Sequence, residues 1–161
     1  DTLLLAQDLP EDAKIIAIDL ASEMLLRVGE GADLIKGAAI SLLASDIECL
    51  PLNNNIADLV IANASLNLTI YKEVAFKEII RILRPGGRLV ARDLIRLGEL
   101  DVELAQDPGA WNTSLGGVML ENELVDAARQ AGFDQLDISE HTPFGPVTAV
   151  RLEAIKAKEN L

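Results

Sequence analysis

Residues 14–25 have the sequence KIIAIDLASEML. A continuous apolar run ends on one carboxylate, Asp19, and a helical pattern begins directly after it. Apolar runs of this length are typical of strands buried on both faces, as in parallel sheets covered by helices. We therefore expect a buried strand over residues 14–19 and a helix over residues 22–29, with Ser22 as its cap.

Strand and helix signals alternate along the rest of the chain. Apolar runs predict further strands over residues 39–44, 57–62, 88–95, 133–139 and 147–155. Apolar residues at helical spacing predict helices over residues 2–8, 73–83 and 120–131. Such alternation predicts an α/β fold with a Rossmann-like, doubly wound and mostly parallel sheet. The last two strands, joined by a short turn-rich loop, are expected to form an antiparallel hairpin at one edge.

Composition limits the classes of partner and site. The chain has 161 residues, half of them apolar, and we expect a single domain over residues 1–161. A net charge of -12 argues against a nucleic-acid partner and an anionic membrane surface, and leaves room for a small cationic ligand. One cysteine, Cys49, and one histidine, His141, cannot form a disulfide, a cysteine cluster or a His-pair metal site, so no metal is expected.

The location and the oligomeric state are less constrained. No secretory leader opens the sequence, and no apolar run reaches the length of about 20 residues that spans a bilayer. We therefore expect a cytoplasmic protein without a membrane partner. The sequence leaves the oligomeric state open, a dimer included.

Polar residues follow several of the predicted strands. In doubly wound sheets, ligands bind outside the carboxyl ends of the strands. Asp19, residues 45–47, residues 63–65 and residues 92–93 stand at such ends. A carboxylate at the place of Asp19 is the pattern of an acceptor for the ribose hydroxyls of a nucleoside. The alternative is that Asp19 only caps the helix that follows it.

Several segments together resemble a known family. They are, in order, IAIDLASEML at 16–25, SDIECLPL at 45–52, ADLVIANASLNL at 57–68, FKEIIRILRPGGRLVARDLI at 76–95 and DPGAWNTSLGGVMLENELVDAARQAGF at 107–133. Their order and spacing resemble the class I S-adenosylmethionine-dependent methyltransferases, most of all the branch that contains arsenite methyltransferases. The resemblance runs over nearly the whole chain. It implies the cofactor S-adenosylmethionine and a small-molecule methyl acceptor.

The resemblance also implies site residues. Asp19 and Leu20 would bind the cofactor, with the acid on the ribose. Asp46 and Ile47 would border the adenine, and Asn63 would lie beside the methionine moiety. The positions on the acceptor side are Ala64, Asn67, Trp111, Asn112 and Ser114. For two of these, a plainer alternative stays open: Asn67 as a turn residue and Trp111 as a packing anchor.

The sequence departs from the family pattern in its glycine-rich loop. In the family this loop and the strand before it precede the position of Asp1, and neither occurs here. The strand is central in the family sheet, and a sheet without it would leave two ladders unpaired. We therefore expect an amino-terminally incomplete domain whose missing central strand lies upstream, with a rearranged fold as the alternative.

A second departure concerns the substrate. Relatives that methylate arsenite hold it through cysteine thiolates, which are soft ligands for a soft centre. Those positions match Ala64, Asn112 and Ser114, so the sequence favours a small organic acceptor. We expect methyl transfer to such a molecule, and no catalytic base is identified. The alternatives are a methyltransferase-like module without catalysis, which serves binding or assembly, and an NAD-type dinucleotide binder.

Overall fold

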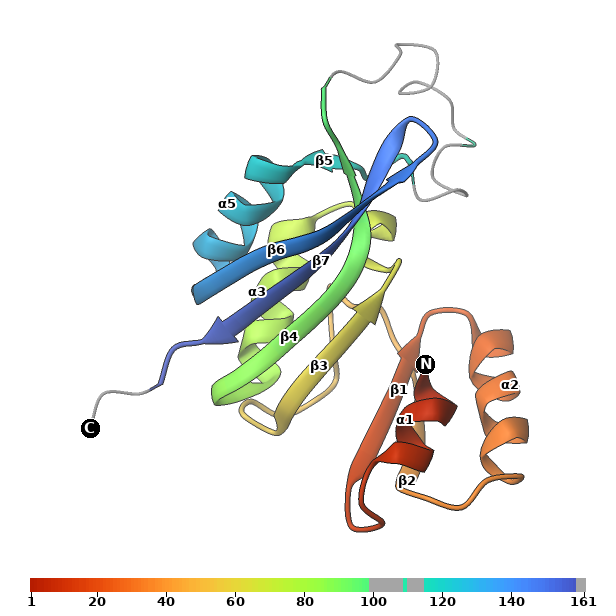
Figure 1. Ribbon diagram of the computed structural model, residues 1–161. Helices are drawn as coiled ribbons and strands as arrows, with labels where there is room; N and C mark the ends of the chain where they lie inside the picture. The colour runs from red at the N-terminus through yellow and green to blue at the C-terminus, as the bar shows by residue number, and fades with distance from the viewer. Residues whose placement is uncertain (99–108, 110–114, 159–161) are drawn as a thin grey trace. The chain divides into compact units, whose positions relative to one another are not determined.

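The computed structural model describes residues 1–98, 109 and 115–158 (Figure 1). Its backbone contacts divide the chain into two compact units, Asp1–Pro51 and Leu52–Leu161. We call them the amino-terminal unit and the carboxyl-terminal unit. Neither contains a helix, among the residues described, that is long and apolar enough to cross a membrane.

The amino-terminal unit contains one pair of parallel strands and two helices. Its elements are α1 (Thr2–Asp8), β1 (Lys14–Asp19), α2 (Ser22–Ala32) and β2 (Ala39–Ala44). β1 and β2 pair in parallel, and Asp19 stands opposite Ala44 at the carboxyl end. The predicted bounds of both strands are thereby confirmed, while α2 is longer than the predicted helix.

Two details of β1 and α2 differ from expectation. β1 is not buried on both faces: Ala17 is its buried residue, and Ile16 is 41% exposed. Within the amino-terminal unit β1 pairs with β2 alone, so no second neighbouring strand there supplies side chains that would cover its faces. Ser22 does not cap α2 either. The cap position is Ala21, whose N–H donates to Asp19 Oδ1 at 2.8 Å, so the Asp19 side chain fixes the entry to the helix.

A close contact joins α1 to the segment before β2. Ala38 N–H donates to the carbonyl of Ala6 at 2.8 Å, and Ala6 is fully buried. A Cβ on Gly37 would lie 1.9 Å from the same carbonyl oxygen. Only glycine allows this approach, so Gly37 is needed where α1 packs.

The carboxyl-terminal unit is a mixed sheet with two helices. Its elements are β3 (Ala57–Asn63), a 3-10 turn (Leu66–Leu68), α3 (Lys72–Ile82), β4 (Leu83–Arg96), β5 (Met119–Leu120), α5 (Glu121–Ala131), β6 (Phe133–Phe144) and β7 (Val147–Lys156). The strand order is β3-β4-β7-β6, with β5 also pairing with β4. β3 and β5 run parallel to β4, and β7 runs antiparallel to β4 and β6. The predicted Rossmann-like sheet with an antiparallel edge hairpin is thereby confirmed.

Helices α3 and α5 lie side by side along one face of this sheet (Figure 1). Phe76 of α3 meets Phe133 of β6 edge to face, with ring centroids 6.2 Å apart. Leu89, Ala91 and Asp93 alternate along β4 as buried residues, so this side of the strand faces the core. The core of the unit therefore lies between these helices and the sheet.

β4 begins earlier than the sequence predicts. α3 ends at Ile82 and the strand starts at Leu83, five residues before the expected start at Arg88. The pairing with β3 is irregular here, because Ala57 stands opposite Leu83 and Leu59 opposite Arg88. The Pro85-Gly86-Gly87 segment therefore forms an irregularity inside β4 and not a loop before it.

Candidate functional site

Two carboxylates stand at the carboxyl end of the strand pair in the amino-terminal unit. Asp19 ends β1, and Asp46 follows β2 by two residues. The two ends are adjacent, since Ser45 N–H donates to the carbonyl of Asp19 at 3.2 Å. Asp19 Oδ1 accepts from Ala21 N–H, and Asp46 Oδ1 accepts from Glu48 N–H at 2.9 Å. Within the described chain, the Oδ2 atom of each acid has no hydrogen bond.

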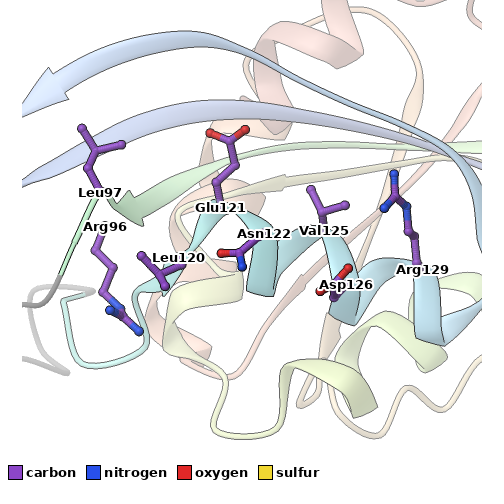
Figure 2. Close-up of a pocket in the computed structure, with 8 residues that line it drawn as sticks. All are labelled: Arg96, Leu97, Leu120, Glu121, Asn122, Val125, Asp126 and Arg129. Atoms are coloured by element: carbon purple, nitrogen blue, oxygen red, sulfur yellow. The ribbon is translucent and has the colours of Figure 1, made fainter.

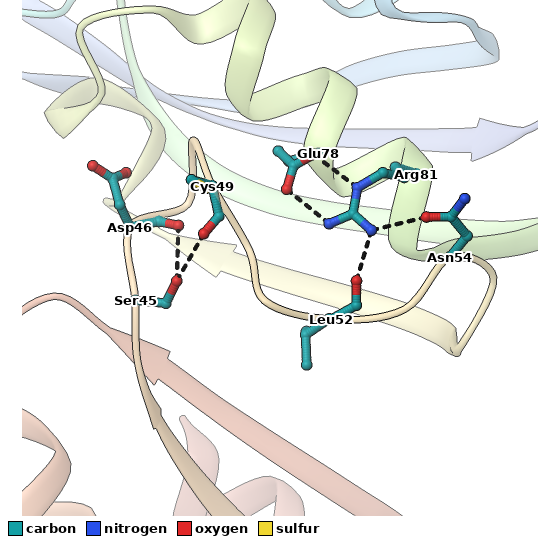
Figure 3. A network of polar contacts seen from close by, with 7 residues as sticks. All are labelled: Ser45, Asp46, Cys49, Leu52, Asn54, Glu78 and Arg81. Carbon is teal, nitrogen blue, oxygen red and sulfur yellow. Dashed lines mark hydrogen bonds and ion pairs between the residues drawn. The ribbon is translucent and has the colours of Figure 1, made fainter.

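The loop after β2 is held by its own hydrogen bonds. Ser45 Oγ donates to the carbonyls of Asp46 at 3.2 Å and Cys49 at 3.0 Å, as Figure 3 shows. Cys49 N–H donates to the carbonyl of Asp46 at 3.1 Å. Ile47 is half-buried, and Leu20 is 73% exposed. Acceptor oxygens and exposed apolar surface therefore stand close together at this end of the unit.

In the carboxyl-terminal unit, the residues after β3 occupy the corresponding strand end. Asn63 is the last residue of β3, and both Asn63 and Ala64 are exposed. Ala64 has a left-handed backbone with φ of 53°, and its N–H donates to the carbonyl of Arg92 at 2.8 Å. An alanine in this conformation is uncommon and marks a strained turn.

Asn67 does not point outward from this turn. It is 2% exposed, and its Nδ2 donates to the carbonyl of Leu94 at 2.7 Å. Its main-chain N–H donates to Asp93 Oδ2 at 3.1 Å. The side chain is thus committed to the fold, which supports the alternative of a turn role for this residue.

Asn67 belongs to a set of buried polar side chains that the sequence did not reveal. We call Asn67, Thr69, Lys72 and Asp93 the buried polar cluster; each is at most 6% exposed. Burial raises the pKa of the Asp93 carboxyl above its ordinary value, although hydrogen bonds from Leu94, Asn67 and Leu66 and the charge of Lys72 oppose the shift. Lys72 Nζ donates to the carbonyl of Thr69 at 3.4 Å.

The other residues singled out in the sequence contribute less to the candidate site than the two strand ends do. Trp111, Asn112 and Ser114 lie outside the described residues. His141 is exposed, and its Nε2 lies 2.8 Å from Glu121 Oε2. Cys49 is exposed as well. Residues 1–98, 109 and 115–158 contain no group of three or more His, Cys, Asp and Glu residues that could hold a metal ion.

Arg81 of α3 organises the start of the carboxyl-terminal unit (Figure 3). Its guanidinium pairs with Glu78 at 2.8 Å and donates to the Leu52 carbonyl at 2.6 Å and to Asn54 Oδ1 at 2.9 Å. The main-chain carbonyl of Arg81 accepts Asn55 N–H at 3.0 Å. These contacts hold the segment that leads into β3, so their role is in the fold and not in a site.

A pocket of about 400 Å³ lies beside α5 (Figure 2). It is lined by Arg96, Leu97, Leu120, Glu121, Asn122, Val125, Asp126 and Arg129. Arg96 is already engaged, because its guanidinium pairs with Glu123 at 3.2 Å and donates to the carbonyl of Gly98 at 3.0 Å. Arg129 stands at the far end of the pocket (Figure 2). The two cations therefore do not converge on a common point.

Comparison with known proteins identifies relatives. A family model described as a methyltransferase domain matches residues 2–91. An arsenite methyltransferase of Halobacterium salinarum is 26% identical over 139 residues, which cover 86% of this chain and 36% of that protein. The ubiquinone/menaquinone biosynthesis C-methyltransferase UbiE of Burkholderia vietnamiensis is 35% identical over 78 residues, which cover 48% of this chain and 32% of that protein. The matched part is thus about a third of the length of each relative.

The fold also has solved counterparts. The crystal structure of an arsenic(III) S-adenosylmethionine methyltransferase from Chlamydomonas reinhardtii matches with a TM-score of 0.82. The sequence identity is 21%, and the match covers 96% of this chain and 58% of that chain. At this identity, the match shows a shared fold.

Proposed function

Since this chain belongs to the methyltransferase domain family, we propose that it binds S-adenosylmethionine and transfers the methyl group to a small organic molecule. The proposal treats residues 1–161 as one such domain. When bound, the cofactor supplies a methyl group on a sulfonium centre; the bond from carbon to sulfur breaks as the bond to the acceptor forms. For this reaction, the residues of the chain have to bind the cofactor and the acceptor, orient them and exclude water.

The observation that carries the proposal is the pair of carboxylates, Asp19 and Asp46. Each acid keeps one oxygen for the local backbone and has a second oxygen without a hydrogen bond in the described structure. An adenosine group offers ribose hydroxyls and an exocyclic amine, which are donors for two such acceptors. Leu20 and Ile47 add apolar surface for the flat base. The chemistry of these residues therefore fits the nucleoside part of the cofactor.

The acceptor side is assigned from the carboxyl-terminal unit. In this proposal Asn63 lies beside the methionine moiety, and the strained, exposed Ala64 borders the acceptor. Asn112, Ser114 and Trp111 would complete the acceptor side. Hydroxyl, amide and aromatic groups suit an organic molecule, whereas tight binding of trivalent arsenic needs about three soft donors. Arsenite is therefore expected to be a poor acceptor.

A methyl-transfer assay tests the proposal. The full-length protein is incubated with S-adenosylmethionine labelled in the methyl group and with two probes, arsenite with reduced thiol and a hydroquinone. We expect label in an organic acceptor and none in arsenic species. Turnover to methylarsenicals would overturn the acceptor assignment. Label in neither probe would overturn the proposed methyl transfer as a whole.

A further inference from the structure

Ala64 needs a rigid support to keep its conformation. A left-handed backbone is unfavourable for a non-glycine residue. Ala64 is exposed and directly follows β3, so burial of its own side chain does not provide this energy. Residues of this kind persist where the surrounding structure holds them, often at ligand sites. The support has to come from the groups beneath the turn.

The buried polar cluster provides this support for the Ala64 turn by filling a gap along β4. β3 pairs with β4 as far as Arg92, and β5 pairs with it from Ile95 onward. Between them, the Leu94 carbonyl accepts Asn67 Nδ2, and Leu94 N–H donates to Asp93 Oδ1 at 3.0 Å. The other oxygen of Asp93 accepts Asn67 N–H. The side chains of Asn67 and Asp93 thus make the hydrogen bonds to β4 that a neighbouring strand would make in this gap, and they tie the turn after Ala64 to β4.

Lys72, a member of the cluster, and Gly117, which lies outside it, give the cluster further contacts. Lys72 is 5% exposed, and its charge stabilises the ionised Asp93. A Cβ on Gly117 would lie 2.0 Å from the carbonyl oxygen of Asn67 and 2.8 Å from Lys72 Nζ. The backbone at Gly117 therefore packs directly against Asn67 and Lys72, with no space for a side chain between them.

We propose that Asp93 and Asn67 are positioning residues that hold the Ala64 turn in the geometry that receives the methyl acceptor. This inference rests on the proposed function, because that function supplies the methyl acceptor that the turn would receive. Neither residue touches the acceptor, since both are buried below the turn. Each acts through the main chain of residues 64–68.

Kinetics separate this role from a merely structural one. The variants are Asp93→Asn and Asn67→Ala, and the matched controls are Asp126→Asn and Asn122→Ala, both exposed on α5. We expect the KM for the hydroquinone probe to rise about fivefold or more, because a displaced turn misplaces the acceptor. The affinity for S-adenosylmethionine should stay within about twofold, since only acceptor binding is lost. Acceptor and cofactor constants that change together, or not at all, would overturn the inference.

Amide hydrogen exchange tests the same inference without catalysis. In the full-length protein, the Asn67 and Leu94 amides should exchange faster in Asp93→Asn than in wild type, while those of β6 and β7 stay protected. Gly117→Ala, which acts from the loop, should have the same effect if Asp93→Asn does not fold. Unchanged exchange at both amides would overturn the inference. If wild type methylates no probe, the proposed function fails, and the exchange result still decides whether the cluster holds the turn.

Discussion

At the scale of single residues, Asp19 serves both the fold and the proposed site. One oxygen of its carboxylate accepts Ala21 N–H and fixes the entry to α2. The other has no hydrogen bond within the residues described, and it lies at the end of a strand where nucleosides bind in folds of this type. The two readings of Asp19, helix cap and ribose acceptor, are therefore compatible, because they use different atoms.

Asp19→Asn separates these two roles. Asparagine keeps an oxygen for Ala21 N–H and removes the charge offered to the ribose, so α2 should form normally. Hydrogen bonds to charged groups are worth about 1.5–3 kcal/mol, and we therefore expect S-adenosylmethionine to bind about tenfold more weakly or worse. Calorimetric titration measures this, with Asp12→Asn, an exposed acid outside the strand end, as the control. Equal affinity of wild type and Asp19→Asn would show that Asp19 only caps the helix.

The pKa of Asp93 predicts a pH dependence of stability. The folded pKa is raised above the ordinary value of 3.8, mainly by burial, so the folded protein holds this proton more tightly than the unfolded chain. The resulting stabilisation is present below that value and is lost as the pH rises through the folded pKa. The Asp93→Asn variant has no carboxyl group to ionise at this position, so it does not lose stability in this way. Urea denaturation from about pH 4 to pH 7 should show the wild type losing stability relative to Asp93→Asn as the pH rises. A difference that stays constant over this range would contradict the shift.

At the scale of elements, the packing of α1 depends on one glycine. Gly37→Ala would place a Cβ 1.9 Å from the Ala6 carbonyl, so the backbone would have to move. Overpacking of this kind costs about 1–3 kcal/mol. We expect Gly37→Ala to lower the free energy of unfolding by this amount, measured by urea denaturation. Gly98→Ala is the control, because a Cβ there meets nothing within 4 Å. Equal effects of both substitutions would refute the packing argument.

Some elements could be predicted from the sequence for a clear physical reason. β1 and β2 have the predicted bounds, because each is an apolar run ended by polar residues. The start of β4 could not be predicted, since Pro85-Gly86-Gly87 has the composition of a helix stop, whereas Leu83 and Arg88 on either side of it pair with β3 only in the folded sheet. For the site, the strand-end acid Asp19 follows the local pattern, whereas Lys72 resembles any surface lysine. Its burial results from contacts between distant segments, and no local signal carries that information.

At the scale of the whole molecule, charge and fold agree with the proposed ligand. The net charge of -12 disfavours phosphate-rich partners, while S-adenosylmethionine carries a positive sulfonium. A dinucleotide such as NAD carries two phosphates, and in proteins with this type of sheet it also binds at the carboxyl ends of strands. The two ligands share the ribose and the adenine, so Asp19 and Asp46 alone do not separate them. The distinction has to come from the part of each ligand beyond the nucleoside.

Calorimetric titration of the full-length protein with S-adenosylmethionine, and in parallel with NAD, measures directly whether the chain binds the proposed methyl donor. We expect saturable binding of S-adenosylmethionine with one site per chain and no measurable heat with NAD. Binding of NAD without binding of S-adenosylmethionine would contradict it.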